Sequence, residues 1–217
     1  MTLTEPTIAL VAGETSGDQL GAALVEKLSE RFPGARFVGI AGDGMKAAGV
    51  EAWWDTSELS VMGLFEVLSH IPRLLRLRRA LFRRLLETRP DVFIGIDAPV
   101  FNLGLEIKLR RAGIRTVHYV SPTVWAWREK RVRKIARAVD LLLCLFPFEP
   151  RFYREHQVSA VYVGHPLADQ IDPDLDRSLA RPQIGIDPRA PTVAILPGSR
   201  RSEVARLAGP MIEAARI

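Results

Sequence analysis

The sequence predicts an α/β protein built on a doubly wound parallel sheet. Short runs rich in valine and isoleucine recur along the 217 residues and alternate with longer segments of helical period. The apolar runs are continuous, which indicates strands buried on both faces, and alternation of strand and helix is typical of a parallel sheet. Ligands of such sheets bind at loops that follow the carboxyl ends of the strands. Those loops are where functional residues are expected.

Seven strands are expected: Ile8–Ala12, Arg36–Ile40, Val92–Ile96, Thr116–Val120, Leu141–Leu145, Val161–Val163 and Thr192–Leu196. Five segments have the apolar spacing of helices: Gln19–Arg31, Leu68–Thr88, Leu103–Ala112, Lys130–Ala138 and Glu203–Arg216.

A change in composition after His165 and Pro166 divides the chain. Residues 167–191 are rich in proline and polar side chains, as expected of a connection between domains. A single strand and helix follow, and one such unit cannot bury both faces of a strand. We therefore expect a domain at 1–166, a linker at 167–191 and the beginning of an incomplete second domain at 192–217. Its apolar faces would lack partners, which predicts a loose C-terminus or self-association.

Composition narrows the class of protein. Cys144 is the single cysteine, so a disulfide framework is excluded, and its apolar neighbours are typical of a buried thiol. The N-terminus does not resemble a signal peptide, and no apolar run approaches the roughly 20 residues that span a bilayer. A cytoplasmic protein is expected. The net charge of +5 favours anionic partners, which could be phosphorylated small molecules, anionic lipid or nucleic acid.

The loop after the first strand, Ala12–Asp18, has glycines that permit a tight turn into a helix whose N-terminus suits an anion. We assign Glu14 to a substrate hydroxyl, and Ser16 and Gly17 to substrate binding. The alternative is that Thr15 or Ser16 only caps the helix. The loop does not fit the nicotinamide fingerprint G-x-G-x-x-G.

Asp97 follows a fully apolar strand and precedes Pro99, which favours an extended turn. A carboxylate on so rigid a backbone is a candidate general base. Its alternative roles are to cap the following helix or to bond loop amides. Asn102, at the beginning of that helix, is assigned to substrate binding.

The segment after the fourth strand contains Trp125 and Trp127, which predict a platform for a sugar, base or acyl chain. The alternative is that the two rings close the core. Ser121 and Arg128 flank them as substrate-binding candidates, whereas His118 falls within the strand and is expected in the core. Farther along, a second turn before a helix suits a diphosphate without a metal, through Gly198, Ser199 and Arg200.

The segment 61–88 combines an apolar face with a face of arginines and few acidic residues. An ordinary amphipathic helix accounts for the period. The preceding apolar residues and the excess of arginine favour a surface that lies on anionic lipid. The expected membrane contacts are Val61, Met62, Leu64, Phe65, Leu68, Arg73 and Arg76.

Taken together, the motifs resemble those of lipid-A-disaccharide synthases. The resemblance covers the chain in order, on the segments Ala12–Asp18, Gly95–Pro99, His118–Arg128, Gly164–Pro166 and Leu196–Arg200. It implies a glycosyltransferase-B fold of two Rossmann-like domains with the active site between them. It also implies transfer of 2,3-diacylglucosamine from UDP-diacylglucosamine to diacylglucosamine 1-phosphate, with inversion and release of UDP.

In the reaction that the resemblance implies, Asp97 would be the base and Glu14 would assist it. Arg200 and Ser199 would receive the charge of the diphosphate. No metal or other cofactor is expected, because backbone N–H groups and an arginine would meet the diphosphate oxygens without a metal. Most of the nucleotide site of such an enzyme would lie beyond Ile217, so this chain is expected to be inactive alone.

Three alternatives differ from that reaction. The chain could be another glycosyltransferase-B member or a UDP-sugar epimerase, but neither needs the tryptophan loop or the basic apolar helix. It could be a fragment that binds lipid acceptor and membrane without catalysis. A nucleic-acid binder is disfavoured, because the arginines lie on an amphipathic helix and no recognised module is present.

Overall fold

The computed structural model describes residues 5–59, 64–124, 131–172, 174, 176–187, 189–198 and 201–216. Its centre is a parallel sheet of seven strands: β1 Thr7–Ala12, β2 Arg36–Ala41, β3 Glu51–Asp55, β4 Val92–Ile96, β5 Arg115–Tyr119, β6 Leu141–Cys144 and β7 Ala160–Tyr162. The order across the sheet is β3-β2-β1-β4-β5-β6-β7. The chain therefore runs outward in one direction from β1 and in the other direction from β4, which makes their boundary the switch point of a doubly wound fold.

The described helices are α1 Thr15–Arg31, α2 Asp43–Ala47, the 3-10 helix η1 Thr56–Glu58, α3 Leu64–Thr88, α4 Pro99–Arg111, α6 Val132–Ala138, α7 Glu149–Glu155, α8 Pro166–Gln170, α9 Arg177–Gln183 and α10 Arg201–Ala214. None of the helices in the described part of the chain is long and apolar enough to cross a membrane.

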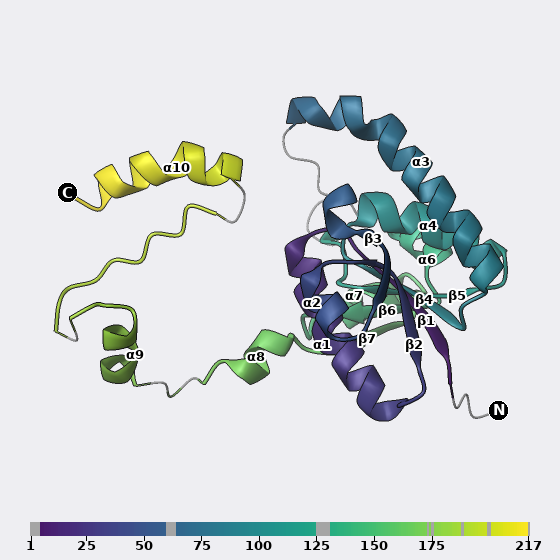
Figure 1. Ribbon diagram of the computed structural model, residues 1–217, viewed down its shortest axis with the longest axis horizontal. Helices are drawn as coiled ribbons and strands as arrows, with labels where there is room; N and C mark the ends of the chain where they lie inside the picture. Colours follow the sequence, from purple (N-terminus) through teal and green to yellow (C-terminus); the bar gives the residue numbers. More distant parts are fainter. Residues whose placement is uncertain are drawn as a thin grey trace.

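Both faces of the sheet are buried, as the continuous apolar runs predict. Ile8, Leu10 and Ala12 of β1 pack in the core on the side of α1 and α2. Ala9 and Val11 of the same strand pack on the opposite side, with α3 and α4. Figure 1 shows α1 and α3 on opposite sides of the sheet. A third apolar cluster joins α6 and α7 to β6. The predicted α/β fold is confirmed.

Two differences concern strands. The edge strand β3 was not predicted; its residues are only partly buried, and it begins and ends with the charged Glu51 and Asp55. The strand predicted at 192–196 is wrong, because the structure has none there; Val193 and Leu196 are 71% and 78% exposed. An apolar run becomes a strand only beside another strand that completes its hydrogen bonds. No neighbouring strand pairs with 192–196 in the described part of the chain.

The chain after α8 runs apart from the sheet (Figure 1). Many of its apolar side chains are exposed, among them Leu179, Ile184, Leu207 and Ile212. These residues fall in the predicted linker and the predicted second unit. The self-association expected of that unit stays a prediction.

Candidate functional site

The loops that carry Glu14 and Asp97 lie side by side at the switch point. Strands β1 and β4 are paired in parallel with Ala12 opposite Ile96, so both loops leave the sheet at the same place. They also touch: a Cβ atom placed on Gly13 would lie 2.8 Å from the Cβ of Ala98. Glycine at this position lets the two loops approach each other.

Asp97 is held in an unusual backbone conformation. Asp97 and Ala98 both have left-handed backbone angles, with φ of 49° and 44°, which costs a non-glycine residue roughly 1–2 kcal/mol. Two hydrogen bonds support the turn: the Asp97 N–H donates to the carbonyl of Tyr119 at 2.8 Å, and the Asp97 carbonyl accepts from Nδ2 of Asn102 at 2.9 Å. Such strain is typical of functional turns.

The structure does not support the alternative roles of Asp97. Ala98 is the N-cap of α4, and no side chain caps that helix. Among the described residues, the half-buried Asp97 carboxylate has neither a hydrogen bond nor an ion pair, and it lines a cavity. Its oxygens are therefore available to a ligand.

In the first loop, no hydroxyl group caps helix α1. Glu14 is the N-cap residue of α1, although its side chain makes no capping bond, and Thr15 and Ser16 are the first two residues of the helix. Capping by either hydroxyl is therefore wrong. Gly17 is buried, with Ile96 and Ala12 beside its Cα, so it packs the helix against the strand ends and does not face a ligand.

Asp18, for which no role was predicted, joins α1 to α2. Its buried carboxylate accepts backbone N–H bonds from Gly42 at 2.7 Å, Gly44 at 2.8 Å and Met45 at 3.3 Å. It thereby satisfies the free N–H groups at the beginning of α2. The signal that could have revealed it is the pair of glycines around Asp43, because a Cβ at either one would lie 3.0 Å or less from this carboxylate.

Beneath Asp97 lies a layer of three buried polar side chains, Asn102, Glu106 and His118. The assignment of Asn102 to substrate binding needs correction, because its amide is fully buried and donates to the carbonyls of Val11, Ile96 and Asp97. It ties the ends of β1 and β4 to α4. The sequence could show that a polar residue follows the strand, but not that it points inward.

Glu106 and His118 form a fully buried pair, with 2.7 Å between Oε1 and Nδ1. Burial raises the pKa of Glu106, and His118 opposes part of that rise. The expected place of His118 in the core is confirmed. Gly95 leaves room for the pair, since a Cβ there would lie 2.2 Å from Oε1 of Glu106.

A cavity of about 650 Å³ contains both candidate acids, Glu14 and Asp97. One wall is apolar and comes from α3 and the beginning of α4, through Ile71, Leu74, Leu75, Val100 and Phe101. Arg78 of α3 also lines it. The lining of the cavity therefore combines two carboxylates and a guanidinium with an apolar wall.

The structure does not bring Ser16 and Ser121 to this cavity. The hydroxyl of Ser121 is buried and donates to the hydroxyl of Tyr153 at 3.0 Å, which in turn donates to the carbonyl of Pro122 at 2.9 Å. Burial raises the pKa of Tyr153 to about 12. Ser121 therefore secures the beginning of its loop, and its assignment to substrate binding needs correction. Trp125, Trp127 and Arg128 lie outside the described residues.

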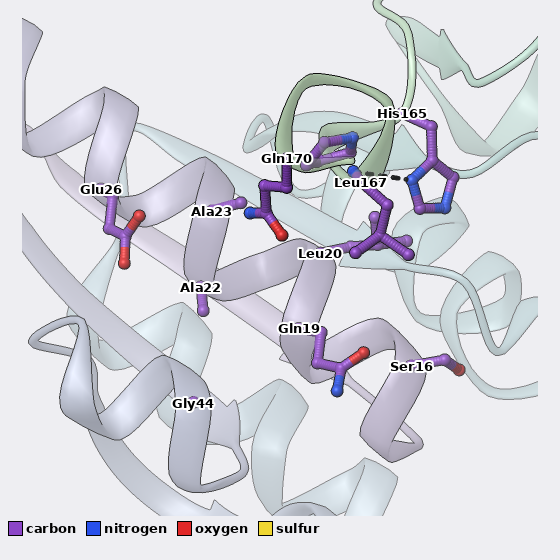
Figure 2. A pocket seen from close by; sticks show the side chains of 11 residues that line it. Ser16, Gln19, Leu20, Ala22, Ala23, Glu26, Gly44, His165, Leu167 and Gln170 are labelled. Atoms are coloured by element: carbon purple, nitrogen blue, oxygen red, sulfur yellow. Dashed lines mark hydrogen bonds between the residues drawn. The ribbon is translucent and has the colours of Figure 1, made fainter. Parts of the chain in front are cut away.

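Ser16 lines a second cavity, of about 400 Å³, between α1 and α8 (Figure 2). On the α8 side, Nδ1 of His165 accepts a bond from the Leu167 N–H at 3.2 Å and so caps the helix. Gln170 from α8 and Gln19 from α1 also line it. This places the Gly164–Pro166 segment beside the first loop, although it is far away in the sequence.

Much of the expected diphosphate and membrane surface lies outside the described residues. This holds for Ser199, Arg200, Val61 and Met62, and for the side chains of Leu64, Phe65 and Leu68. Gly198 is exposed, with φ of 120°.

Two arginines of α3 have protein partners that the sequence did not reveal. Arg73 forms an ion pair with Glu58, and the guanidinium of Arg84 lies 4.3 Å from the ring centre of Trp53. Arg76 is exposed. The basic face of α3 is thus partly engaged by the domain itself.

The seven-stranded parallel sheet with helices on both faces defines an α/β protein of the doubly wound, Rossmann-like class. A solved glycotransferase of kitacinnamycin has a TM-score of 0.51 at 16% identity, over 74% of this chain and 51% of that chain. A UDP-GlcNAc 2-epimerase from Neisseria meningitidis, bound to UDP-GlcNAc, has a TM-score of 0.52 at 10% identity, over 83% of this chain and 50% of that chain. At these identities the likeness concerns the fold alone.

Sequence similarity gives the family. The family model described as Lipid-A-disaccharide synthetase matches residues 8–217. A Lipid-A-disaccharide synthase of Xanthomonas campestris pv. campestris (strain 8004) is 57% identical over 210 residues, which make up 97% of this chain and 48% of that protein. The chain belongs to the lipid-A-disaccharide synthetase family, and it spans about half the length of the curated relatives it matches. The resemblance is confirmed, and an epimerase is disfavoured.

Proposed function

We propose that this chain provides the acceptor-binding part of a lipid-A-disaccharide synthase. The complete enzyme transfers 2,3-diacylglucosamine from its UDP derivative to 2,3-diacylglucosamine 1-phosphate, which gives a β-1,6-linked disaccharide and UDP. The observation that carries the proposal is the Asp97 carboxylate. It is half-buried, has no hydrogen bond or ion pair within the described chain, and lines a cavity with an apolar wall.

In the proposed reaction Asp97 takes the proton from the 6-hydroxyl of the acceptor. The oxygen then bonds to the anomeric carbon of the donor as the bond to the diphosphate breaks, and that electron pair leaves with UDP. One displacement inverts the α-linked donor to a β product, by the same logic as an inverting glycosidase with a sugar hydroxyl in place of water. The rigid turn around Asp97 serves this role because a base must be held within hydrogen-bond reach of one hydroxyl.

Other residues would support the transfer. Glu14, in the same cavity, orients the acceptor. Gly198, Ser199 and Arg200 receive the diphosphate at the beginning of α10, where backbone N–H groups and a guanidinium neutralise its charge. We propose that the reaction needs no metal or other cofactor. Within the described residues there is no group of three His, Cys, Asp or Glu side chains that could hold a metal ion.

We also propose that the protein works on the cytoplasmic face of the inner membrane. Both sugars carry acyl chains, and the apolar side chains of Ile71 and Leu75 on α3 are 40% and 37% exposed. Exposed arginines on the same helix would bind anionic lipid. Helix α3 also lines the cavity, so a helix resting on the membrane would place the cavity next to the acyl chains.

The test is glycosyl transfer from UDP-diacylglucosamine to diacylglucosamine 1-phosphate in detergent micelles, by a full-length relative and by this chain. Turnover by the relative alone is expected. The matching Asp97→Asn change in the relative should abolish turnover and leave the fold intact, because asparagine tolerates left-handed backbone angles. Near-normal turnover of that variant would remove Asp97 from the role. Turnover by the 217-residue chain would show that the donor site lies within these residues or is completed by self-association.

A further inference from the structure

Arg78 departs from the amphipathic pattern of α3. The helix buries Leu77, Leu81 and Leu85 against the sheet, and Leu74 and Leu75 line the cavity. Arg78 lies four residues after Leu74 and three after Leu75, so it shares their face of the helix. A charged side chain at such a position is half-buried and loses part of its hydration.

The neighbouring helix makes room for this guanidinium. A Cβ atom on Gly104 of α4 would lie 2.9 Å from Nη1 of Arg78, so glycine at 104 lets the Arg78 head lie against α4. Within the described part of the chain, Arg78 has no ion pair and no hydrogen bond, although the cavity that it lines also contains Glu14 and Asp97. Arg78 therefore lines the cavity as a donor that has no acceptor among the described residues.

The lining of the cavity defines the ligand chemistry. Apolar side chains of α3 and α4 suit acyl chains, the two acids suit sugar hydroxyls, and an unpaired guanidinium suits an anion. Arginine binds phosphate through two parallel N–H bonds, which fixes the orientation of the phosphate as well as its position. A ligand that meets all three requirements is an acylated sugar with a phosphomonoester.

We propose that Arg78 binds the phosphate of the acceptor and so fixes which hydroxyl of the sugar reaches Asp97. The inference rests on the proposed function and adds a specificity residue to it. The 1-phosphate and the reacting 6-hydroxyl are carried by the same sugar ring, so an anchor for one restricts the position of the other. The same guanidinium could meet a phospholipid headgroup, because α3 carries exposed apolar residues; the experiment separates the two sources.

The experiment measures binding of two acyl sugars to this chain in neutral detergent micelles, diacylglucosamine 1-phosphate and the same sugar without phosphate. The native chain should bind the phosphorylated sugar about tenfold or more tightly, since charge-assisted bidentate bonds are among the strongest. Arg78→Met should bring the two affinities within about twofold, and Arg78→Lys should fall in between. Arg115→Met, which removes an exposed arginine at the beginning of β5, is the matched control and should keep the full preference.

Gly104→Ala tests the same site without removing the charge. Alanine favours the helix, so the variant should fold, while its Cβ displaces the guanidinium and lowers the preference for phosphate. Full preference in both Arg78→Met and Gly104→Ala would overturn the inference. A native chain that binds both sugars equally would overturn it and leave the proposed function standing. Binding of neither sugar would count against both.

Vesicles distinguish the lipid source. Sedimentation with phosphatidylglycerol and with phosphatidylcholine vesicles should change little in Arg78→Met. Loss of binding to the anionic vesicles, together with an unchanged preference for the sugar phosphate, would assign Arg78 to the membrane and overturn the proposal.

Discussion

The Nδ1 atom of His118 lies 2.7 Å from Oε1 of Glu106, and both side chains are fully buried under the turn that holds Asp97. The pair joins β5 to α4, and Asn102 of the same helix binds the carbonyl of Asp97. The second oxygen of Glu106 and Nε2 of His118 have no hydrogen-bond partner within the described residues. The two side chains therefore depend on each other.

Removing one member of the pair should destabilise the fold strongly. Glu106→Leu leaves His118 buried without its partner, and such losses cost about 3–5 kcal/mol. The double change Glu106→Leu/His118→Leu should cost less than the sum of the two single changes, because no buried polar group is then abandoned. Urea unfolding of the four proteins measures this. Additive losses would show that the two side chains act independently.

The contact between Gly13 and Ala98 predicts that a glycine at 98 restores the stability lost when Gly13 is changed to alanine. Gly13→Ala would place two Cβ atoms 2.8 Å apart and should cost about 1–3 kcal/mol of unfolding free energy. Ala98→Gly relieves a left-handed backbone at 98 and should stabilise by up to about 1 kcal/mol. In the double variant the clash disappears, so its stability should exceed the sum of the single effects. Thermal unfolding measures all three, and strict additivity would argue against the contact.

The position of the site could be predicted from sequence, whereas the orientation of its side chains could not. Asp97 follows an apolar strand, and strand ends are where parallel sheets bind ligands. Asn102 near the beginning of α4 and Ser121 after β5 also lie close to strand ends, but each points inward and satisfies backbone or side-chain partners. The order of residues gives the edge of the sheet, and only packing decides which side of it a side chain faces.

Strand β3 and the position of Arg78 were not predicted from the sequence, and each has a physical reason. The edge strand β3 has charges at both ends and only partly buried residues, so it lacks the continuous apolar run of a central strand. No role was predicted for Arg78, because it does not belong to the basic face that the other arginines of this segment form. Its spacing from Leu74 and Leu75 is the signal that distinguishes it, and the importance of that spacing becomes clear only with Gly104 beside it.

The single cysteine predicts how stability changes at alkaline pH. Cys144 is buried, and burial raises the pKa of its thiol from the ordinary value of 9.0 to about 12. Between these two values the unfolded chain loses a proton that the folded chain keeps, so stability falls as pH rises. The slope contributed by this group is at most about 1.4 kcal/mol per pH unit. Urea unfolding at pH 8, 9 and 10 should show the loss.

Cys144→Ala is the control for that measurement, because it removes the thiol and should make the dependence on pH shallower over the same range. An equal slope in the native chain and in Cys144→Ala would assign the alkaline loss to other groups. A thiol reagent should also modify Cys144 only as the protein unfolds. Rapid modification of the folded protein at pH 8 would contradict the burial of the thiol.

Binding to anionic membrane should depend on the apolar residues at the beginning of α3. Changing Leu64, Phe65 and Leu68 together to serine removes roughly 0.8 kcal/mol of transfer free energy for each buried CH₂ group lost. The variant should no longer sediment with phosphatidylglycerol vesicles, while its far-ultraviolet circular dichroism and melting temperature stay close to those of the native chain.

Leu179→Ser/Ile184→Ser is the control, because these side chains on and just after α9 are exposed at 66% and 72%. If membrane binding depends on α3, this control should sediment like the native chain. Equal sedimentation of the triple variant would remove α3 from the membrane surface, and equal loss in both variants would indicate that any exposed apolar group suffices.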